Sequence, residues 1–263
     1  MEEKKGTIII IIILLLIIVG LGGYIAYDRL ISKKEDEEIL TKIDDVSIDL
    51  NAFYQISETL TKLDKAFNDP KSNYFAYIYN QKKLEAKNFD LGAAIYTSIR
   101  SDFKEVNMLL SIPEPIAKSN FTRIFGNNLK YEPIQVNSTD YLKIAYNTTT
   151  LAYDYIAPTD TNIYPSEYMA LNAKTTLKGD KVIITRKIVF VDYEIEPGTT
   201  IASSINLYKD ETKTKKIGEL VLKNGKANQR EILSKYGSKL NTFNYTFEQN
   251  TSTEYSLKLI EKV

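Results

Sequence analysis

The chain has 263 residues, with 34 basic and 34 acidic side chains, and it contains neither cysteine nor histidine. The missing cysteine excludes disulfides, thiolate nucleophiles and cysteine-ligated metal centres. The missing histidine excludes the Ser-His-Asp triad and the commonest transition-metal ligand. Because nucleic-acid binding normally needs a basic excess, a formal charge of zero predicts no nucleic-acid partner.

A hydrophobic segment at residues 7–27 follows a short N-terminal tail, residues 1–6. Residues 8–19 are an unbroken run of Ile, Leu and Val, and residues 20–27 add only small, apolar and aromatic side chains. The segment would span about 31 Å as a helix, which matches a hydrocarbon core of about 30 Å. The sequence therefore predicts one transmembrane helix that contacts the lipid bilayer through residues 7–27.

Two other interpretations of this segment are a cleaved signal peptide and a buried core helix. A cleaved signal has a shorter apolar region and a small-residue cleavage site, which Gly20-Leu21-Gly22 matches poorly. A core helix needs no such long charge-free run. We therefore expect an uncleaved anchor in the cell membrane.

The orientation of the anchor rests on its flanking charges. Basic residues lie on both sides of it, Lys4 and Lys5 before it and Arg29, Lys33 and Lys34 after it. The lysine and arginine counts are nearly equal, so they do not decide the orientation. A short tail before a signal-anchor usually stays in the cytoplasm, and we expect the large domain to be extracytoplasmic.

Residues 28–44 form a charged juxtamembrane stalk, after which apolar residues recur at a spacing of three or four up to Phe67. This period predicts an amphipathic helix, packed either on its own domain or in a parallel coiled coil next to the membrane. Four residues crowd the middle of the run and offer caps that would instead interrupt it: Asp44, Asp45, Ser47 and Asp49. The spacing of a calcium loop also occurs here, at Asp45, Ser47, Asp49 and Asn51. A calcium loop further needs a glycine at its sixth position and a glutamate at its twelfth, where this chain has Leu50 and Ile56, so we do not predict a calcium site.

The rest of the chain divides into a mainly helical part, residues 45–128, and a mainly β part, residues 129–263. The helical part has a turn at 68–70, a short strand or helix at 73–79, and two helices, one from 88 or 90 to about 100 and one over 113–126. Strands are expected at 129–137, 150–157, 167–177, 181–193, 200–208, 216–222, 241–248 and 253–262, with a helix over 228–236.

Because these strands follow one another directly in sequence, antiparallel pairing is favoured. The predicted fold class is therefore α+β: an N-terminal transmembrane helix, then helices, then a mostly antiparallel sheet. Residues 45–263 are expected to form one globular unit.

Five short segments carry a resemblance. They are Ile-Phe-Gly-Asn at 124–127, Tyr-Asp-Tyr at 153–155, Asn-Ile-Tyr at 162–164, Tyr-Thr-Phe at 245–247 and Ile-Glu-Lys at 260–262. The chain from about residue 45 to residue 263 resembles uncharacterised single-pass membrane-anchored proteins of AT-rich bacteria. The resemblance implies a membrane location and no particular chemistry.

Asp192, Glu194 and Glu196 alternate with apolar residues, so a strand would place three carboxylates on one face. They are candidate ligands of a hard cation, or one of them is an acid. The simpler interpretation is the wet face of an antiparallel strand.

Ser101 and Lys104 match the first motif of serine acyl-enzymes, and Ser204-Ile205-Asn206 resembles the second. The third motif, Lys-Thr-Gly, is absent. Chance and ordinary polar positions explain the match, and we assign no catalytic, cofactor-binding or metal-binding residue.

Tyrosine is frequent, with 19 residues. Exposed tyrosines form binding surfaces, whereas buried ones pack well in strands. The binding-surface candidates are two pairs, Tyr153 with Tyr155 and Tyr164 with Tyr168.

The function predicted from these observations is an extracytoplasmic binding or scaffolding domain on a single-pass anchor, with an unidentified protein or cell-surface partner. The alternative is an envelope hydrolase that uses paired carboxylates, since Asp and Glu are the strong acid–base groups available.

We expect residues 1–27 to remain on the mature protein, because the apolar run is long and its cleavage site is poor. Intact-mass measurement of protein extracted from membranes tests this expectation. A mature N-terminus near Gly23 would contradict it.

Overall fold

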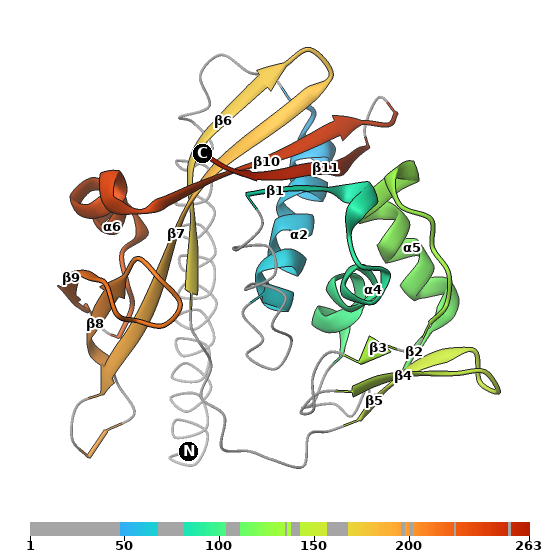
Figure 1. Cartoon of the computed structure of the whole chain (residues 1–263), viewed down its shortest axis with the longest axis horizontal. Helices are drawn as coiled ribbons and strands as arrows, with labels where there is room; N and C mark the ends of the chain where they lie inside the picture. The colour runs from blue at the N-terminus through green and yellow to red at the C-terminus, as the bar shows by residue number, and fades with distance from the viewer. Residues whose placement is uncertain are drawn as a thin grey trace, which may run out of the picture. The chain divides into compact units, whose positions relative to one another are not determined.

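The computed structural model describes residues 48–67, 82–103, 111–134, 136–137, 143–156, 168–195, 198–199, 202–223, 225–251 and 254–263. The chain divides into two compact units, Met1–Asp45 and Val46–Val263. All described residues belong to the second unit, which is α+β with antiparallel sheets, as predicted (Figure 1). The proposed transmembrane segment and stalk lie outside them. Within the described ranges, no helix is long and apolar enough to cross a membrane.

Four α-helices are described. They are α2 (Leu50–Phe67), α4 (Leu91–Ile99), α5 (Glu114–Phe125) and α6 (Gln229–Tyr236). Short 3-10 turns follow or precede them: η1 (Ala86–Asn88), η2 (Arg100–Asp102), η3 (Gly126–Asn128) and η4 (Gly237–Lys239). All four α-helices lie within segments for which the sequence predicted helices. The segment 73–79 lies outside the described residues.

Side-chain caps set the starts of three helices. The Asp49 carboxylate accepts a hydrogen bond from the Asn51 backbone N–H at 2.9 Å, so α2 begins at Leu50. The Asp90 and Asn228 side chains cap α4 and α6 in the same way. The capping interpretation of Asp49 is therefore confirmed, while Asp44, Asp45 and Ser47 lie outside the described part of the chain.

The larger sheet has the strand order β1-β11-β10-β7-β8-β9, with β6 also pairing to β7. Its strands are β1 (Lys83–Glu85), β6 (Tyr168–Lys178), β7 (Lys181–Ile195), β8 (Ala202–Tyr208), β9 (Lys216–Val221), β10 (Asn241–Gln249) and β11 (Tyr255–Lys262). The smaller sheet has the order β2-β5-β4-β3, from β2 (Ser111–Pro113), β3 (Val136–Asn137), β4 (Lys143–Asn147) and β5 (Ala152–Ile156).

Three strands depart from the sequence prediction. β1 and β2 lie within the part expected to be mainly helical, and they pair with β11 and β5 of the β part. Each has only three residues, which is too few to show a period of two. β4 was not predicted, and residues 129–134, which were expected to be extended, form no strand.

β7 organises the hydrophobic interior because both of its faces are buried. Ile188 and Phe190 belong to a core shared with α2, α4 and α5, whereas Val189 and Val191 belong to a second core that includes Ile232 of α6. The alternating side chains of one long strand thus separate two cores.

Helix α2 packs inside its own unit and does not present its apolar stripe to a coiled-coil partner. Ala52, Ile56, Leu63 and Ala66 are almost fully buried in the larger core. The alternative of a helix packed on its own domain is therefore the correct one for α2.

A charged pair ties α2 to the sheet. Arg186 of β7 donates two hydrogen bonds to the Asp64 carboxylate, at 2.8 and 2.6 Å, and one to the Ala170 carbonyl at 3.2 Å. The Arg186 guanidinium also lies 5.3 Å from the centre of the Tyr245 ring. The Arg186 side chain is 4% exposed and the Asp64 side chain 31%.

We expect Asp64→Asn to destabilise the unit by about 2–3 kcal/mol, because it leaves the buried Arg186 guanidinium without its counter-ion. This value is below the full cost of an unpaired buried charge because Asp64 is partly exposed. Urea denaturation measures it. The matched control is Glu132→Gln, which breaks the exposed pair with Lys130 and should leave stability nearly unchanged, because solvent screens an exposed ion pair. Equal effects of the two variants would contradict the prediction.

Candidate functional site

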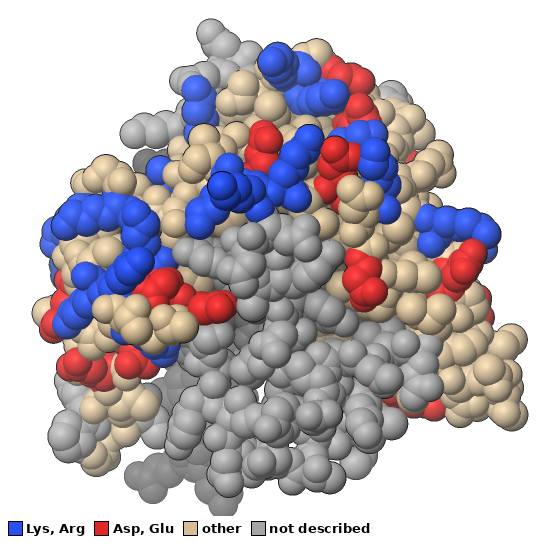
Figure 2. Space-filling view, viewed as in Figure 1, with Lys and Arg blue, Asp and Glu red and all other residues tan. Residues whose placement is uncertain are grey.

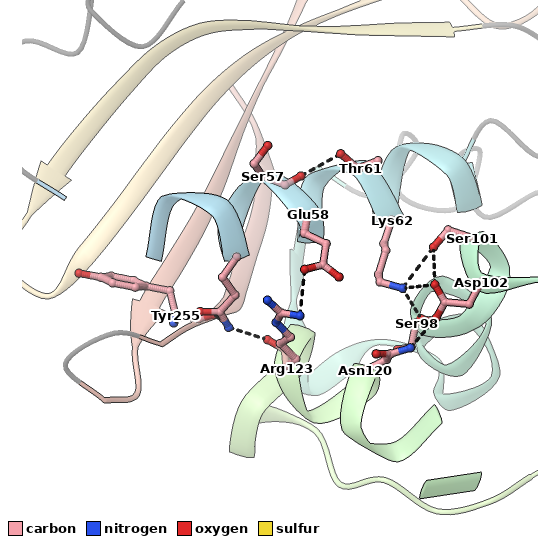
Figure 3. Close-up of polar contacts among 11 residues, drawn as sticks. Ser57, Glu58, Thr61, Lys62, Ser98, Ser101, Asp102, Asn120, Arg123 and Tyr255 are labelled. Atoms are coloured by element: carbon pink, nitrogen blue, oxygen red, sulfur yellow. Dashed lines mark hydrogen bonds and ion pairs between the residues drawn. The ribbon is translucent and has the colours of Figure 1, made fainter. Parts of the chain in front are cut away.

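Helix α2 carries several polar side chains into the interior (Figure 3). The Gln55 side-chain amide donates to the Tyr255 carbonyl at 2.9 Å and accepts from the Tyr255 N–H at 3.0 Å, so it satisfies both backbone groups at the start of β11. It also donates to the Arg123 carbonyl at 3.2 Å. These contacts satisfy buried backbone groups that would otherwise be costly, and they have a structural purpose.

Lys62 lies at the centre of a second polar group. Its ammonium donates to the Ser98 carbonyl at 3.1 Å, the Ser101 hydroxyl at 3.2 Å and the Asp102 carboxylate at 2.8 Å (Figure 3). Asp102 also accepts hydrogen bonds from the Ser101 hydroxyl and the Asn120 amide. The group joins α2 to α4, η2 and α5.

This geometry bears on the acyl-enzyme motif. Lys104 lies outside the described residues, and the lysine beside Ser101 is Lys62. A lysine that acts as a general base needs a lone pair directed at the serine proton. Here Lys62 donates to three acceptors, and the Ser101 proton is directed to Asp102. The arrangement stabilises the contacts between the helices, and the group that accepts from the Ser101 hydroxyl is the Asp102 carboxylate and not a lysine.

The predicted carboxylates lie near the C-terminal end of β7. Asp192 is exposed and forms an ion pair with Lys213 at 2.9 Å. Glu194 accepts hydrogen bonds from the Asn206 amide at 2.7 Å and from the Ser204 hydroxyl at 3.3 Å, while Glu196 lies outside the described ranges. Ser204 and Asn206, the residues of the second acyl-enzyme motif, therefore bind a carboxylate here.

Charge does not single out a site on the face of the molecule that Figure 2 shows. Basic and acidic side chains are interspersed on the face that Figure 2 shows, which fits the formal charge of zero. In the described portion, no group of three or more acidic side chains is arranged to hold a metal ion.

The four tyrosines that were binding-surface candidates do not form one surface among the described residues. Tyr168 is buried, and its hydroxyl donates to the Asp64 carboxylate at 3.2 Å. Tyr155 is half-buried, with its ring centre 5.4 Å from that of Phe103. Tyr153 is fully buried and Tyr164 lies outside the described part of the chain. The structure therefore brings Tyr153 and Tyr155 to one sheet and places Tyr168 in the other.

Tyr153 belongs to a group that the sequence did not reveal, which we call the tyrosine–carboxylate cluster: Glu114, Tyr131, Tyr146 and Tyr153. The Tyr146 hydroxyl donates to the Glu114 carboxylate. The hydroxyls of Tyr131 and Tyr153 are 3.3 Å apart, and the rings of Tyr146 and Tyr153 have their centres 5.1 Å apart. Glu114, Tyr131 and Tyr146 are half-buried and border solvent.

Local structure explains how these residues meet. Glu114 is the first residue of α5, after Pro113, and its backbone N–H donates to the Leu151 carbonyl at 2.8 Å. This contact holds the β4–β5 turn against the helix start. Tyr146 and Tyr153 are directly opposite each other on β4 and β5. The Pro-Glu-Pro helix start was visible in the sequence, but Tyr146 lies on the strand that was not predicted.

The carboxylate affects the ionisation of its neighbours. The hydrogen bond to Glu114, together with burial, raises the pKa of Tyr146 to about 12. Burial and the hydrogen bond to Tyr153 raise the pKa of Tyr131 well above 10.0. The tyrosines are therefore neutral hydrogen-bond donors near neutral pH, and Glu114 supplies the negative charge of the cluster.

We expect Tyr146 to ionise near pH 12, and Glu114→Gln to lower its pKa toward the ordinary value of 10.0. A raised folded-state pKa means that the stability contributed by neutral Tyr146 is present below pH 10 and is lost as the pH rises through about 12. NMR titration of ring-labelled tyrosine measures the pKa, with Tyr146→Phe to assign the signal. An unchanged pKa of Tyr146 in Glu114→Gln would contradict the hydrogen bond to Glu114 as the cause of the raised pKa.

The chain matches no protein-family model, no curated protein and no solved structure. The proposal for its function therefore rests on its own residues.

Proposed function

We propose that the chain is a single-pass membrane protein whose unit Val46–Val263 is an extracytoplasmic binding or scaffolding module. The membrane part of the proposal is supported by the sequence of residues 7–27, an apolar run long enough to cross a bilayer. For the orientation we propose that the large unit lies outside the cytoplasm, and cysteine labelling tests this.

The observation that carries the binding proposal is the half-buried tyrosine–carboxylate cluster at the surface. Around Ser101, Lys62 and Asp102 hydrogen-bond within the unit and join its helices. By contrast, Glu114 and Tyr146 border solvent and offer a charge and an aromatic ring to a partner. A binding module needs such groups and no activated nucleophile.

The native chain contains no cysteine, so one introduced thiol reports the side of the membrane on which it lies. We expect Lys130→Cys, at a side chain that is 85% exposed, to react with a membrane-impermeant maleimide in intact cells. Gel shift or mass spectrometry of the purified protein detects the label.

The matched control is Glu3→Cys in the N-terminal tail, which should react only after the cells are permeabilised. The reverse pattern would place the large unit in the cytoplasm and would refute the proposed location. Labelling of both positions in intact cells would refute a single-pass anchor.

A further inference from the structure

Glu114 is one of several half-buried carboxylates whose described partners are neutral, and Asp154 is another. Asp64, Asp102 and Glu248 each form an ion pair with lysine or arginine. Glu114 makes no ion pair with any residue that the structure describes, and one neutral hydroxyl, that of Tyr146, is its only side-chain donor there. The negative charge is partly removed from water without a positive counterpart, apart from the N-terminal end of the α5 dipole.

The surroundings of this carboxylate match the parts of one kind of side chain. The hydroxyl of half-buried Tyr146 contacts Glu114, half-buried Tyr131 joins the same cluster through Tyr153, and aromatic faces attract organic cations. Leu151, whose carbonyl accepts from the Glu114 N–H, is 55% exposed and offers an aliphatic contact. A carboxylate, an aromatic ring and an aliphatic chain are complementary to the charged head and the apolar stem of arginine.

The backbone at Leu151 supports this interpretation. Its φ is 49°, in the left-handed region that asparagine and glycine adopt most readily. A leucine at this turn carries backbone strain and also exposes an apolar side chain to water. Neither feature benefits the isolated fold, whereas both are consistent with a residue that contacts a partner.

We propose that the tyrosine–carboxylate cluster and Leu151 form the docking surface for an arginine side chain of a partner protein. The proposal rests on the proposed binding function and assigns the chemistry of the partner. Charge complementarity favours a cationic protein segment over an anionic membrane surface, which Glu114 would repel. The exposed aliphatic side chain favours an amino-acid stem over a neutral sugar, which stacks on open aromatic faces.

The test uses the full chain in nanodiscs of neutral phosphatidylcholine, with ring-labelled tyrosine observed by NMR. The probes are Nα-acetyl-arginine methylamide and its citrulline counterpart, which keeps the shape and loses the charge. We expect the arginine probe to shift the Tyr146 signal saturably in the millimolar range. The citrulline probe should bind about tenfold more weakly, as expected for loss of a charged hydrogen bond.

Two variants and one control sharpen the test. Glu114→Gln should weaken arginine binding about tenfold, whereas Glu132→Gln, which removes an exposed carboxylate paired with Lys130, should leave it unchanged. Leu151→Asn should weaken binding about threefold without lowering the melting temperature, because asparagine tolerates the left-handed backbone. Weaker binding without loss of stability separates a contact with the ligand from a purely structural effect.

The proposal is overturned if no saturable shift appears, if arginine and citrulline bind equally, or if Glu114→Gln or Leu151→Asn binds as the native chain does. Maltotriose serves as a neutral sugar probe, and an equal shift of Tyr146 by maltotriose would also overturn it. These results do not depend on which side of the membrane the unit occupies. Failure of this inference is therefore distinguishable from failure of the cysteine-labelling test.

Discussion

The burial of helix α2 is the constraint on which the rest of the second unit depends. Helix α2 is covered by other elements of the unit, among them α4 and β11. Because the helix is covered in this way, its charged and amide side chains are carried into the interior, where they meet partners on β7 and β11. Gln55, Lys62 and Asp64 each need a specific partner there, because an unpaired polar group in the interior is costly. Their partners fix the position and rotation of α2 more narrowly than apolar contacts alone would.

The long strand β7 makes this arrangement possible. It extends from Lys181 to Ile195 and pairs with β10, β6 and β8. One of its faces supplies Arg186 to α2 and the other supports the core beneath α6. The smaller sheet supplies Tyr146 and Tyr153, while Tyr131 packs on Phe121 of α5, and these tyrosines meet Glu114 in the tyrosine–carboxylate cluster.

The positions of the polar groups separate structural from functional interpretations. The Lys62 group and the Arg186–Asp64 pair use their hydrogen-bonding capacity within the unit, and so they account for packing. Glu114 keeps a charge that no described cation neutralises, beside a leucine in an unfavourable backbone conformation. A partner side chain with a cationic head and an apolar stem would pair with the Glu114 carboxylate and cover the Leu151 side chain. This complementarity is the basis for the arginine docking proposal.

The sequence by itself determined the helices, most strands and the α+β class, because caps, turns and hydrophobic periods are local signals. The Asp49 and Asp90 caps and the helix over 113–126 are examples, and each rests on residues a few positions apart. It also supplied the hypothesis of a membrane anchor at residues 7–27.

Only the tertiary structure decided which polar residues meet. Arg186 and Asp64 are 122 residues apart, and Gln55 and Tyr255 are 200 apart, so no local pattern relates them. The three-residue strands β1 and β2 likewise exist because β11 and β5 provide their hydrogen bonds. Glu114 and Tyr146 become neighbours for the same reason. The β4–β5 hairpin is local, but the pairing of β2 with β5 brings that hairpin, with Tyr146, beside the start of α5, and β2 and β5 are far apart in the sequence.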